Sequence, residues 1–374
     1  MSFKPFHPTA KTLMGPGPSN VHDRVLQAMA RPTIGHLDPE FIQVMDDIKV
    51  LMRRAFRTEN ALTFPVSAPG SAGMETCIVN LVEPGDKVIV CINGVFGGRQ
   101  KENVERAGGT VVTVEDDWGR AVDLEKVRAA LVANPDAKLL SFVHAETSTG
   151  ASSDAKAICA LAQEHGVLTI ADTVTSLAGS PLLVDDWGID AVYSGTQKCL
   201  SCPPGLSPIT FGPRAVEVIK ARKTKVQSWF LDLSLVINYW EGEGARSYHH
   251  TAPVNAMYGL HEALLMVDEE GLEAAWKRHS ENHQRLKSGL EAMGFSWLPP
   301  EGERLPQLNT VYLPGGIENE GVVRRRLLDN HQLEVGAGLG QLAGKIWRVG
   351  LMGQTSRPDH VDYFLNAVRE EIGR

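Results

Sequence analysis

The sequence predicts an α/β protein, with a large domain in which helices wrap a mainly parallel sheet and a smaller α+β C-terminal domain. Short apolar runs alternate with stretches of helix length over about the first two thirds of the chain, the pattern of βαβ units. At 374 residues the chain is longer than one hydrophobic core usually supports, so a second, smaller unit is expected. Its 43% hydrophobic and 22% charged residues are ordinary for a globular protein, which excludes the disordered and fibrous classes.

The expected elements of the large domain follow one another in a regular order. Periodicity predicts helices at residues 21–30, 41–56, 74–81, 124–131 and 154–165, and strands at residues 61–66, 87–92, 110–114, 138–144, 167–170 and 189–193. In sheets of this kind ligands gather at the carboxyl ends of the strands. Phe96, Thr147, Asp172 and Lys198 each lie just past a predicted strand. We therefore expect these four side chains at one rim of the sheet.

Four segments of the chain are expected. Residues 1–20 form an N-terminal arm and a stiff loop, because residues 15–20 read GPGPSN, with two prolines and two glycines. Residues 21–260 form the large domain, residues 261–293 a long connecting helix, and residues 294–374 the small C-terminal domain. Within this last segment the pattern predicts strands at 307–313, 333–335 and 346–349, and helices at 321–328 and from 358 onward.

Charge and cysteine content narrow the class of protein. The formal net charge of −8 argues against nucleic acid as a partner. Five cysteines, an odd number, do not indicate a disulfide framework and favour a reducing compartment. Cys199 and Cys202 form a C-x-x-C pair, but a second pair with zinc-ligand spacing is lacking, so we expect neither a metal nor a redox role. We find no signal-peptide pattern and no apolar run near the ~20 residues needed to cross a membrane, so a cytoplasmic location is expected.

Lys198 stands between an apolar run and a loop rich in glycine and proline. The preceding run at 189–193 is typical of a buried strand, and Pro203 and Pro204 exclude a continuing helix. Two interpretations are open for its amine. A solvated loop lysine is the common case. An amine in a partly desolvated pocket is instead a nucleophile toward a carbonyl, with which it forms a Schiff base.

Three other positions each allow a structural and a functional interpretation. The turn at residues 67–73 reads SAPGSAG between a strand and a helix, where glycine either relieves steric crowding or exposes N–H groups to a phosphate. Asp172 follows an apolar run and is either a helix N-cap or an anion held against a protonated ring nitrogen. Arg348, flanked by apolar residues, meets either a structural ion-pair partner or a bound carboxylate.

Seven short motifs in order along nearly the whole chain carry a resemblance to a known family. They are GPGPSN at 15–20, NGVFGGR at 93–99, HAETSTG at 144–150, ADTVTSLAG at 171–179, SGTQK at 194–198, SYHHT at 247–251 and GKIWRVGLMG at 344–353. With them the chain resembles the class V, fold-type I pyridoxal-phosphate aminotransferases, and in particular the group that includes the alanine–glyoxylate, serine–pyruvate and serine–glyoxylate enzymes. The resemblance implies pyridoxal 5′-phosphate as cofactor, bound by the large domain, and a substrate loop within residues 1–20.

The resemblance also implies roles for individual residues around the cofactor ring. Lys198 would form the Schiff base and move the proton between the substrate Cα and the cofactor. Asp172 would pair with the pyridinium nitrogen, and Val174 would pack on one face of the ring. Phe96 would stack on the opposite face, where relatives carry a tryptophan. Thr147 would place a hydroxyl near the phenolic oxygen, where relatives often carry a serine.

The phosphate and the second subunit are implied in the same way. Gly70 and Ser71 would hold the phosphate through their backbone, together with Gln197, although relatives often show SGSGH where this chain has SAPGS at 67–71. Tyr248 and Thr251 would reach the cofactor of the neighbouring subunit, which implies a homodimer. The two histidines between them also suggest a metal site, but adjacent side chains generally point apart, so no metal is expected.

The expected function is a ping-pong amino transfer. Arg348 would bind the substrate α-carboxylate, and the amino group would pass from alanine or serine to glyoxylate or pyruvate. Three alternatives remain open at this point: an aminotransferase for a different amine, a lyase or desulfurase with a cysteine nucleophile, and a cofactor-binding homologue without turnover. Cys199 and Cys202 lie too near the lysine to resemble the mobile-loop cysteine of the desulfurases. The residues do not rank the substrates, since one methylene changes binding by only ~1–3 kcal/mol.

Overall fold

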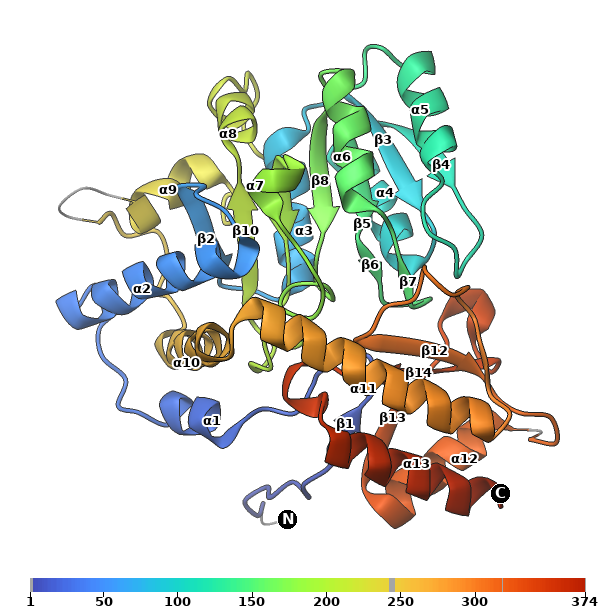
Figure 1. The fold of residues 1–374 in the computed structure, drawn as a ribbon. Coiled ribbons are helices and arrows are strands. Elements are labelled where there is room, and N and C mark those ends of the chain that lie inside the picture. Colours follow the sequence, from blue (N-terminus) through green and yellow to red (C-terminus); the bar gives the residue numbers. More distant parts are fainter. Residues whose placement is uncertain (1–2, 242–245, 318, 374) are drawn as a thin grey trace.

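The computed structural model describes residues 3–241, 246–317 and 319–373. A seven-stranded sheet forms the larger part of the molecule (Figure 1). Its strands, in spatial order, are β2 (Leu62–Val66), β10 (Ser207–Phe211), β9 (Ala191–Tyr193), β8 (Leu168–Asp172), β5 (Leu139–Val143), β3 (Lys87–Ile92) and β4 (Thr110–Glu115). Strand β10 runs antiparallel to both of its neighbours, and the pairs from β9 to β4 are parallel. The predicted α/β class with a mainly parallel sheet is confirmed.

Helices connect and cover these strands. They are α1 (Asp23–Met29), α2 (Pro39–Phe56), α3 (Gly70–Leu81), α4 (Val95–Arg106), α5 (Leu124–Ala133), α6 (Ala155–Glu164), α7 (Val184–Trp187), α8 (Pro213–Lys220), α9 (Leu233–Glu241) and α10 (Val254–Glu270). The start of helix α2 is set by its local sequence: Asp38 accepts a hydrogen bond from the Glu40 N–H, and Pro39 occupies the first turn. Most of its apolar stripe is buried, and Phe41 and Ile48 are fully so.

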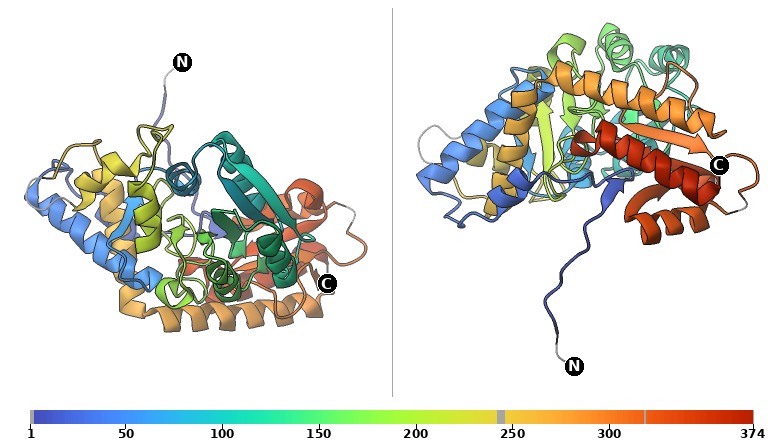
Figure 2. Two further views of the ribbon diagram at one scale, coloured as in Figure 1. Left: turned by 90° about the horizontal axis from the view of Figure 1, so that it is seen from above. Right: turned by 60° about the horizontal axis from the view of Figure 1, so that its bottom comes forward.

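A second sheet of five strands lies beside the first. Its order is β1 (Thr12–Met14), β13 (Leu333–Ala337), β14 (Ile346–Gly350), β12 (Leu308–Tyr312) and β11 (Ser296–Trp297). Helices α11 (Leu272–Ala292), α12 (Glu320–His331) and α13 (Pro358–Ile372) accompany it, and together they enclose a separate hydrophobic cluster around Trp347. Residues 3–10 extend away from the body (Figure 2). The chain then enters β1, which pairs with β13 in parallel register.

The segment expected as one long helix at residues 261–293 is instead two helices. Helix α10 ends at Glu270 and α11 begins at Leu272, with Gly271 between them at φ 81° and ψ 140°. This conformation is open almost only to glycine, so the backbone changes direction at this residue. Helix α11 then runs to the C-terminal sheet (Figure 1).

Other differences concern the bounds of two elements and three elements that were not predicted. Helix α3 starts at Gly70 rather than at residue 74, so the glycine-rich turn is itself the first helical turn. Strand β8 extends to Asp172, two residues beyond its predicted end. Strand β10 and helices α8 and α9 were not predicted. Among the described residues no helix has the length and apolarity that a bilayer crossing requires.

Candidate active site

A cavity of about 230 Å³ opens at the carboxyl ends of β8 and β9. Eight of the residues singled out from the sequence line it: Gly70, Ser71, Phe96, Thr147, Asp172, Val174, Gln197 and Lys198. The expected meeting of Phe96, Thr147, Asp172 and Lys198 at one rim is therefore confirmed. Met74, Arg99 and Tyr193 also line the cavity, and no role at the site was expected for them from the sequence.

Lys198 is held by the N-terminal GPGPSN loop. Its Nζ donates a hydrogen bond to the Pro16 carbonyl, and its own carbonyl accepts one from Ser19 Oγ at 2.7 Å. A Cβ added at Gly17, where φ is +97°, would lie 2.7 Å from Lys198 Nζ, so only glycine allows this approach. Burial, and then the charge of Arg348, lowers the pKa of Lys198 to about 8. Its environment is therefore that of a nucleophilic amine and not of a solvated lysine.

Asp172 is the last residue of β8 and is almost fully buried. Its Oδ1 accepts a hydrogen bond from the Val174 N–H, and its Oδ2 accepts one from the Tyr193 hydroxyl, both at 2.8 Å. A turn follows, so the carboxylate is not a helix N-cap. Burial raises the pKa of Asp172 to about 7 against the lowering effect of these two donors. A carboxylate with this desolvation cost is stabilised by any cation placed next to it.

Tyr193, the hydrogen-bond donor to Asp172, was not selected from the sequence. Strands β8 and β9 are parallel neighbours, and their register pairs Asp172 with Tyr193. Tyr193 was the predicted end of its strand and Asp172 lay just past the predicted end of the other; that these two strands are neighbours in the sheet was not predicted.

The N-terminal end of α3 faces the cavity and suits an anion. The N-cap residue Pro69 makes no side-chain hydrogen bond to the helix. The first N–H groups of a helix have no partner within it, and the helix dipole favours negative charge there. Gly70 approaches the neighbouring chain closely, since an added Cβ would lie 3.3 Å from the Ser194 carbonyl oxygen. Gln197 Oε1 is buried without a hydrogen-bond partner among the described residues.

Arg348 lies on β14 next to the cavity wall. Its Nε donates to the Ala337 carbonyl at 2.7 Å, and its Nη1 donates to the Thr147 carbonyl at 3.3 Å. Burial lowers its pKa to about 10, while the charge of Glu146 acts in the opposite direction. Among the described residues no carboxylate lies within ion-pair distance of this guanidinium. Of the two interpretations of Arg348, the structural ion pair with another side chain is therefore excluded among the described residues.

Tyr248 and Thr251 do not line the cavity. The Tyr248 side chain is 64% exposed, and its ring packs 5.3 Å from the ring of His36. Between them, His249 and His250 form a hydrogen bond through their Nδ1 atoms, and His250 Nε2 meets Ser67 Oγ at 2.7 Å. The SYHHT motif therefore sits beside the turn that precedes α3, and Tyr248 faces outward from its own chain.

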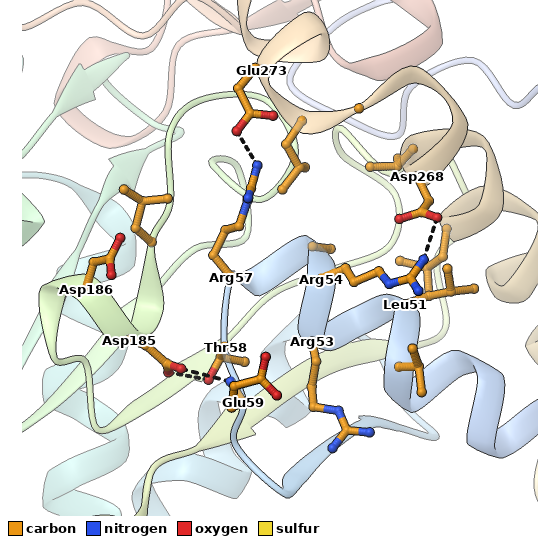
Figure 3. Close-up of a pocket in the computed structure, with 17 residues that line it drawn as sticks. Leu51, Arg53, Arg54, Arg57, Thr58, Glu59, Asp185, Asp186, Asp268 and Glu273 are labelled. Atoms are coloured by element: carbon orange, nitrogen blue, oxygen red, sulfur yellow. Dashed lines mark hydrogen bonds and ion pairs between the residues drawn. The ribbon is translucent and has the colours of Figure 1, made fainter.

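A larger groove of about 720 Å³ lies elsewhere, between the ends of α2 and α10 and the start of α11 (Figure 3). Arg54 pairs with Asp268 at 2.7 Å and Arg57 pairs with Glu273 across it. None of the residues selected from the sequence lines this groove. Two of its three arginines are already paired with carboxylates, and the residues selected from the sequence lie in the other cavity, so this groove is not the candidate active site.

The fold and this cavity match one family. The chain belongs to the class-V aminotransferases, whose family model matches residues 13–348. It is 38% identical to the alanine–glyoxylate aminotransferase of Drosophila melanogaster, over 99% of this chain and 94% of that protein. A solved alanine–glyoxylate aminotransferase from Nostoc sp. is 46% identical with a TM-score of 0.96, covering 100% of this chain and 98% of that one. The ureidoglycine–glyoxylate aminotransferase of Bacillus subtilis is 36% identical with a TM-score of 0.96, covering 99% and 95%. The chain is thus a fold-type I transaminase.

Class V aminotransferases as a family use pyridoxal phosphate, and the chemistry of the cavity fits that group. An anionic phosphate suits the uncapped start of α3. A carbonyl carbon suits the amine of Lys198, whose pKa is lowered to about 8. A protonated ring nitrogen suits the buried carboxylate of Asp172.

Proposed function

We propose that this transaminase moves an amino group from a small L-amino acid, alanine or serine, to glyoxylate or pyruvate by a ping-pong mechanism. The observation that carries the proposal is the meeting of a desolvated amine, Lys198, and a buried carboxylate, Asp172, in one cavity. The names of the relatives in Drosophila melanogaster and Nostoc sp. support the choice of alanine and glyoxylate.

In this proposal the cofactor is held at three points. The backbone of Gly70 and Ser71 and the side chain of Gln197 bind its phosphate, and Asp172 pairs with its ring nitrogen. The ring lies between Val174 and Phe96, and the Thr147 hydroxyl meets the phenolic oxygen. When bound, the cofactor supplies an electron sink that stabilises negative charge at the substrate Cα.

The protein's own residues then handle the carboxylate and the proton. Arg348, which has no ion-pair partner among the described residues, binds the substrate α-carboxylate. Lys198 Nζ takes the proton from Cα and returns it on the cofactor side, a step that requires the neutral amine its lowered pKa favours. Tyr248 and Thr251 act from the neighbouring subunit in a homodimer. The five buried free thiols, which include Cys199 and Cys202, support a reducing, cytoplasmic environment.

Replacement of Lys198 by alanine tests the reaction. Because the proton transfer loses its acid–base group, Lys198→Ala should lower the rate of amino transfer by at least about 10³-fold. Lys277→Ala, at a lysine with a 76% exposed side chain on α11, is the matched control and should behave as wild type. Transfer at the wild-type rate by cofactor-loaded Lys198→Ala would refute the assigned role.

A panel of donors tests the substrates. Alanine, serine, aspartate and (S)-ureidoglycine are each added to the enzyme, and conversion of the bound cofactor to its amine form is followed by absorbance. Alanine or serine should convert it fastest. Faster conversion by (S)-ureidoglycine would favour the second candidate, the activity named for the Bacillus subtilis relative. A band that no amino acid converts would indicate a homologue without turnover.

A further inference from the structure

Helix α4 begins at the cavity, and its own N-cap residue offers no side chain to cap it. Its N-cap residue is Gly94, which makes no side-chain hydrogen bond to the helix. Phe96, the second residue of the helix, lines the cavity. The N–H groups of the first turn have no partner within the helix and need acceptors from elsewhere.

Those acceptors come from residues 146–148, about 50 positions further along the chain. Glu146 Oε2 accepts from the Phe96 N–H at 3.2 Å, and Ser148 Oγ accepts from the Val95 N–H at 3.0 Å. Glu146 Oε1 in turn accepts from the Ser148 N–H at 3.0 Å and from the Ser148 hydroxyl. An added Cβ at Gly94 would lie 2.4 Å from Glu146 Cδ, so glycine is required for the carboxylate to reach the helix.

The same three residues also touch the other side of the cavity. Thr147, between Glu146 and Ser148, lines the cavity, and its carbonyl accepts the hydrogen bond from Arg348 Nη1. Segment 146–148 therefore joins the Phe96 wall to the arginine that we propose for the substrate carboxylate.

The chemistry at this position calls for a carboxylate and not for any polar side chain. Glu146 is fully buried, and each group bonded to it is a donor: the Phe96 N–H, the Ser148 N–H and the Ser148 hydroxyl. An amide of the same shape would turn its own NH₂ toward one of these donors. Burial raises the pKa of Glu146, while these hydrogen bonds, the N-terminal end of α4 and the nearby Arg348 favour its charged form.

We propose that Glu146 is a positioning residue of the transfer reaction: its carboxylate fixes Phe96 against the bound cofactor, and its loop holds Arg348 in place. This inference rests on the proposed function. It assigns to Glu146 no contact with the reacting atoms. It predicts that loss of the carboxylate weakens cofactor binding and substrate binding together.

Glu146→Gln is the deciding variant. Its dissociation constant for pyridoxal phosphate, measured by quenching of tryptophan fluorescence, should rise about tenfold, since one buried donor loses its charged acceptor. The KM of the amino donor should rise by about threefold or more, because the Thr147 carbonyl shifts under Arg348. Glu146→Asp, which keeps the charge, should recover part of both losses.

Glu262→Gln is the matched control. Glu262 on α10 is also buried and accepts a hydrogen bond from Arg24 Nε at 2.8 Å, but it does not line the cavity. Its variant should lose stability while the cofactor dissociation constant and the KM stay at wild-type values. If Glu146→Gln does not fold, Ser148→Ala decides in its place and should weaken cofactor binding by at least about threefold.

Two failures can be told apart. A wild-type chain that neither binds pyridoxal phosphate nor transfers amino groups would contradict the proposed function, and this inference with it. A wild-type chain that does both, while Glu146→Gln shows the same dissociation constant and KM and only a lower Tm, would overturn the inference alone. In that case Glu146 would be a helix cap and nothing more.

Discussion

At the scale of single residues, the cavity holds two groups for which burial disfavours the charged form. The pKa of Lys198 is lowered to about 8 and that of Asp172 is raised to about 7, with burial as the largest cause in both. Each charged form is therefore costly in the folded chain without a cofactor. A bound ring with a cationic nitrogen would remove part of this cost at Asp172.

Because it costs free energy to keep the buried Lys198 amine charged, the free energy of unfolding should depend on pH. The folded pKa of about 8 lies below the ordinary value of 10.5, so between these values the unfolded chain binds more protons and wild-type stability rises with pH. Lys198→Met removes the buried cation and should stabilise the cofactor-free chain by up to roughly 3 kcal/mol at pH 8. This gain should vanish near pH 10.5. Urea unfolding at both pH values measures it.

The exposed Lys277 gives the control for that comparison. Lys277→Met removes a lysine whose side chain is 76% exposed, so it should give no comparable gain in the free energy of unfolding at pH 8. Asp172 is largely ionised throughout this window. A gain for Lys198→Met that did not decline with pH would mean that its amine is not desolvated in the fold.

The sequence was enough to select Lys198 and several of its neighbours as site residues, but it did not show which residues they contact. The motif around Lys198 identified the amine, and the register of β8 and β9 was needed to find Tyr193 as the donor to Asp172. GPGPSN was predicted as a stiff loop. That Gly17 lies against Lys198 depends on a contact between residues about 180 positions apart, which no local pattern encodes.

At the scale of elements, the break at Gly271 has an energetic consequence. A Cβ at Gly271 would meet nothing within 4 Å, so the cost of Gly271→Ala comes from the backbone alone, at φ 81° and ψ 140°. We expect a loss of about 1–3 kcal/mol in the free energy of unfolding. Gly98→Ala is the matched control of opposite sign: Gly98 lies within α4 with equally open space, and alanine should stabilise by roughly 0.5–1 kcal/mol. Urea denaturation of both variants checks the pair.

Equal effects of the two substitutions would contradict this account of the break. Two ion pairs of the groove in Figure 3 lie on either side of this break: Asp268 of α10 binds Arg54 of α2, and Glu273 of α11 binds Arg57, the C-cap residue of α2. The two helices are thus tied to the same partner on either side of Gly271. Helical periodicity before Gly271 and again from Leu272 onward is what led to the prediction of one connecting helix at residues 261–293.

Elements with strong periodicity were predicted well, and elements defined by tertiary packing were not. Strand β3 was predicted to the residue, and α2 to within two residues. Strand β10 follows the lysine loop and pairs antiparallel with β2, nearly 150 residues earlier, so nothing local predicts its place. Helix α3 was predicted to start too late because Gly70 and Gly73 are typical of loops, yet close packing on Ser194 and Ser207 selects them.

At the scale of the whole molecule, the proposed homodimer makes a prediction about mixed subunits. If Tyr248 completes the neighbouring site, a hybrid of a Lys198→Ala subunit and a Tyr248→Ala subunit contains one intact site. Random mixing of two inactive variants should then restore up to about a quarter of wild-type activity, with half of the dimers hybrid and one of their two sites complete. Activity is measured after joint refolding of the two variants.

Two results would count against action from the neighbouring subunit. One is a mixture that stays as inactive as its components although hybrid dimers are present. The other is full activity of Tyr248→Ala by itself.

The division of the chain at residues 260 and 293 also remains a prediction, although the second sheet encloses its own hydrophobic cluster.

Because β1 pairs with β13, the hydrogen bond between Lys198 and Pro16 depends on a strand that is synthesised much later than the lysine itself. Pro16, whose carbonyl accepts the hydrogen bond from Lys198, lies two residues after β1, the short strand that pairs with residues 333–335. The partner of this strand leaves the ribosome about 320 residues later, which is tens of seconds at the usual rates of elongation. The seven-stranded sheet can therefore form while the GPGPSN loop is still unanchored. The amine would gain its final position only after residues 333–335 have been synthesised and have paired with β1.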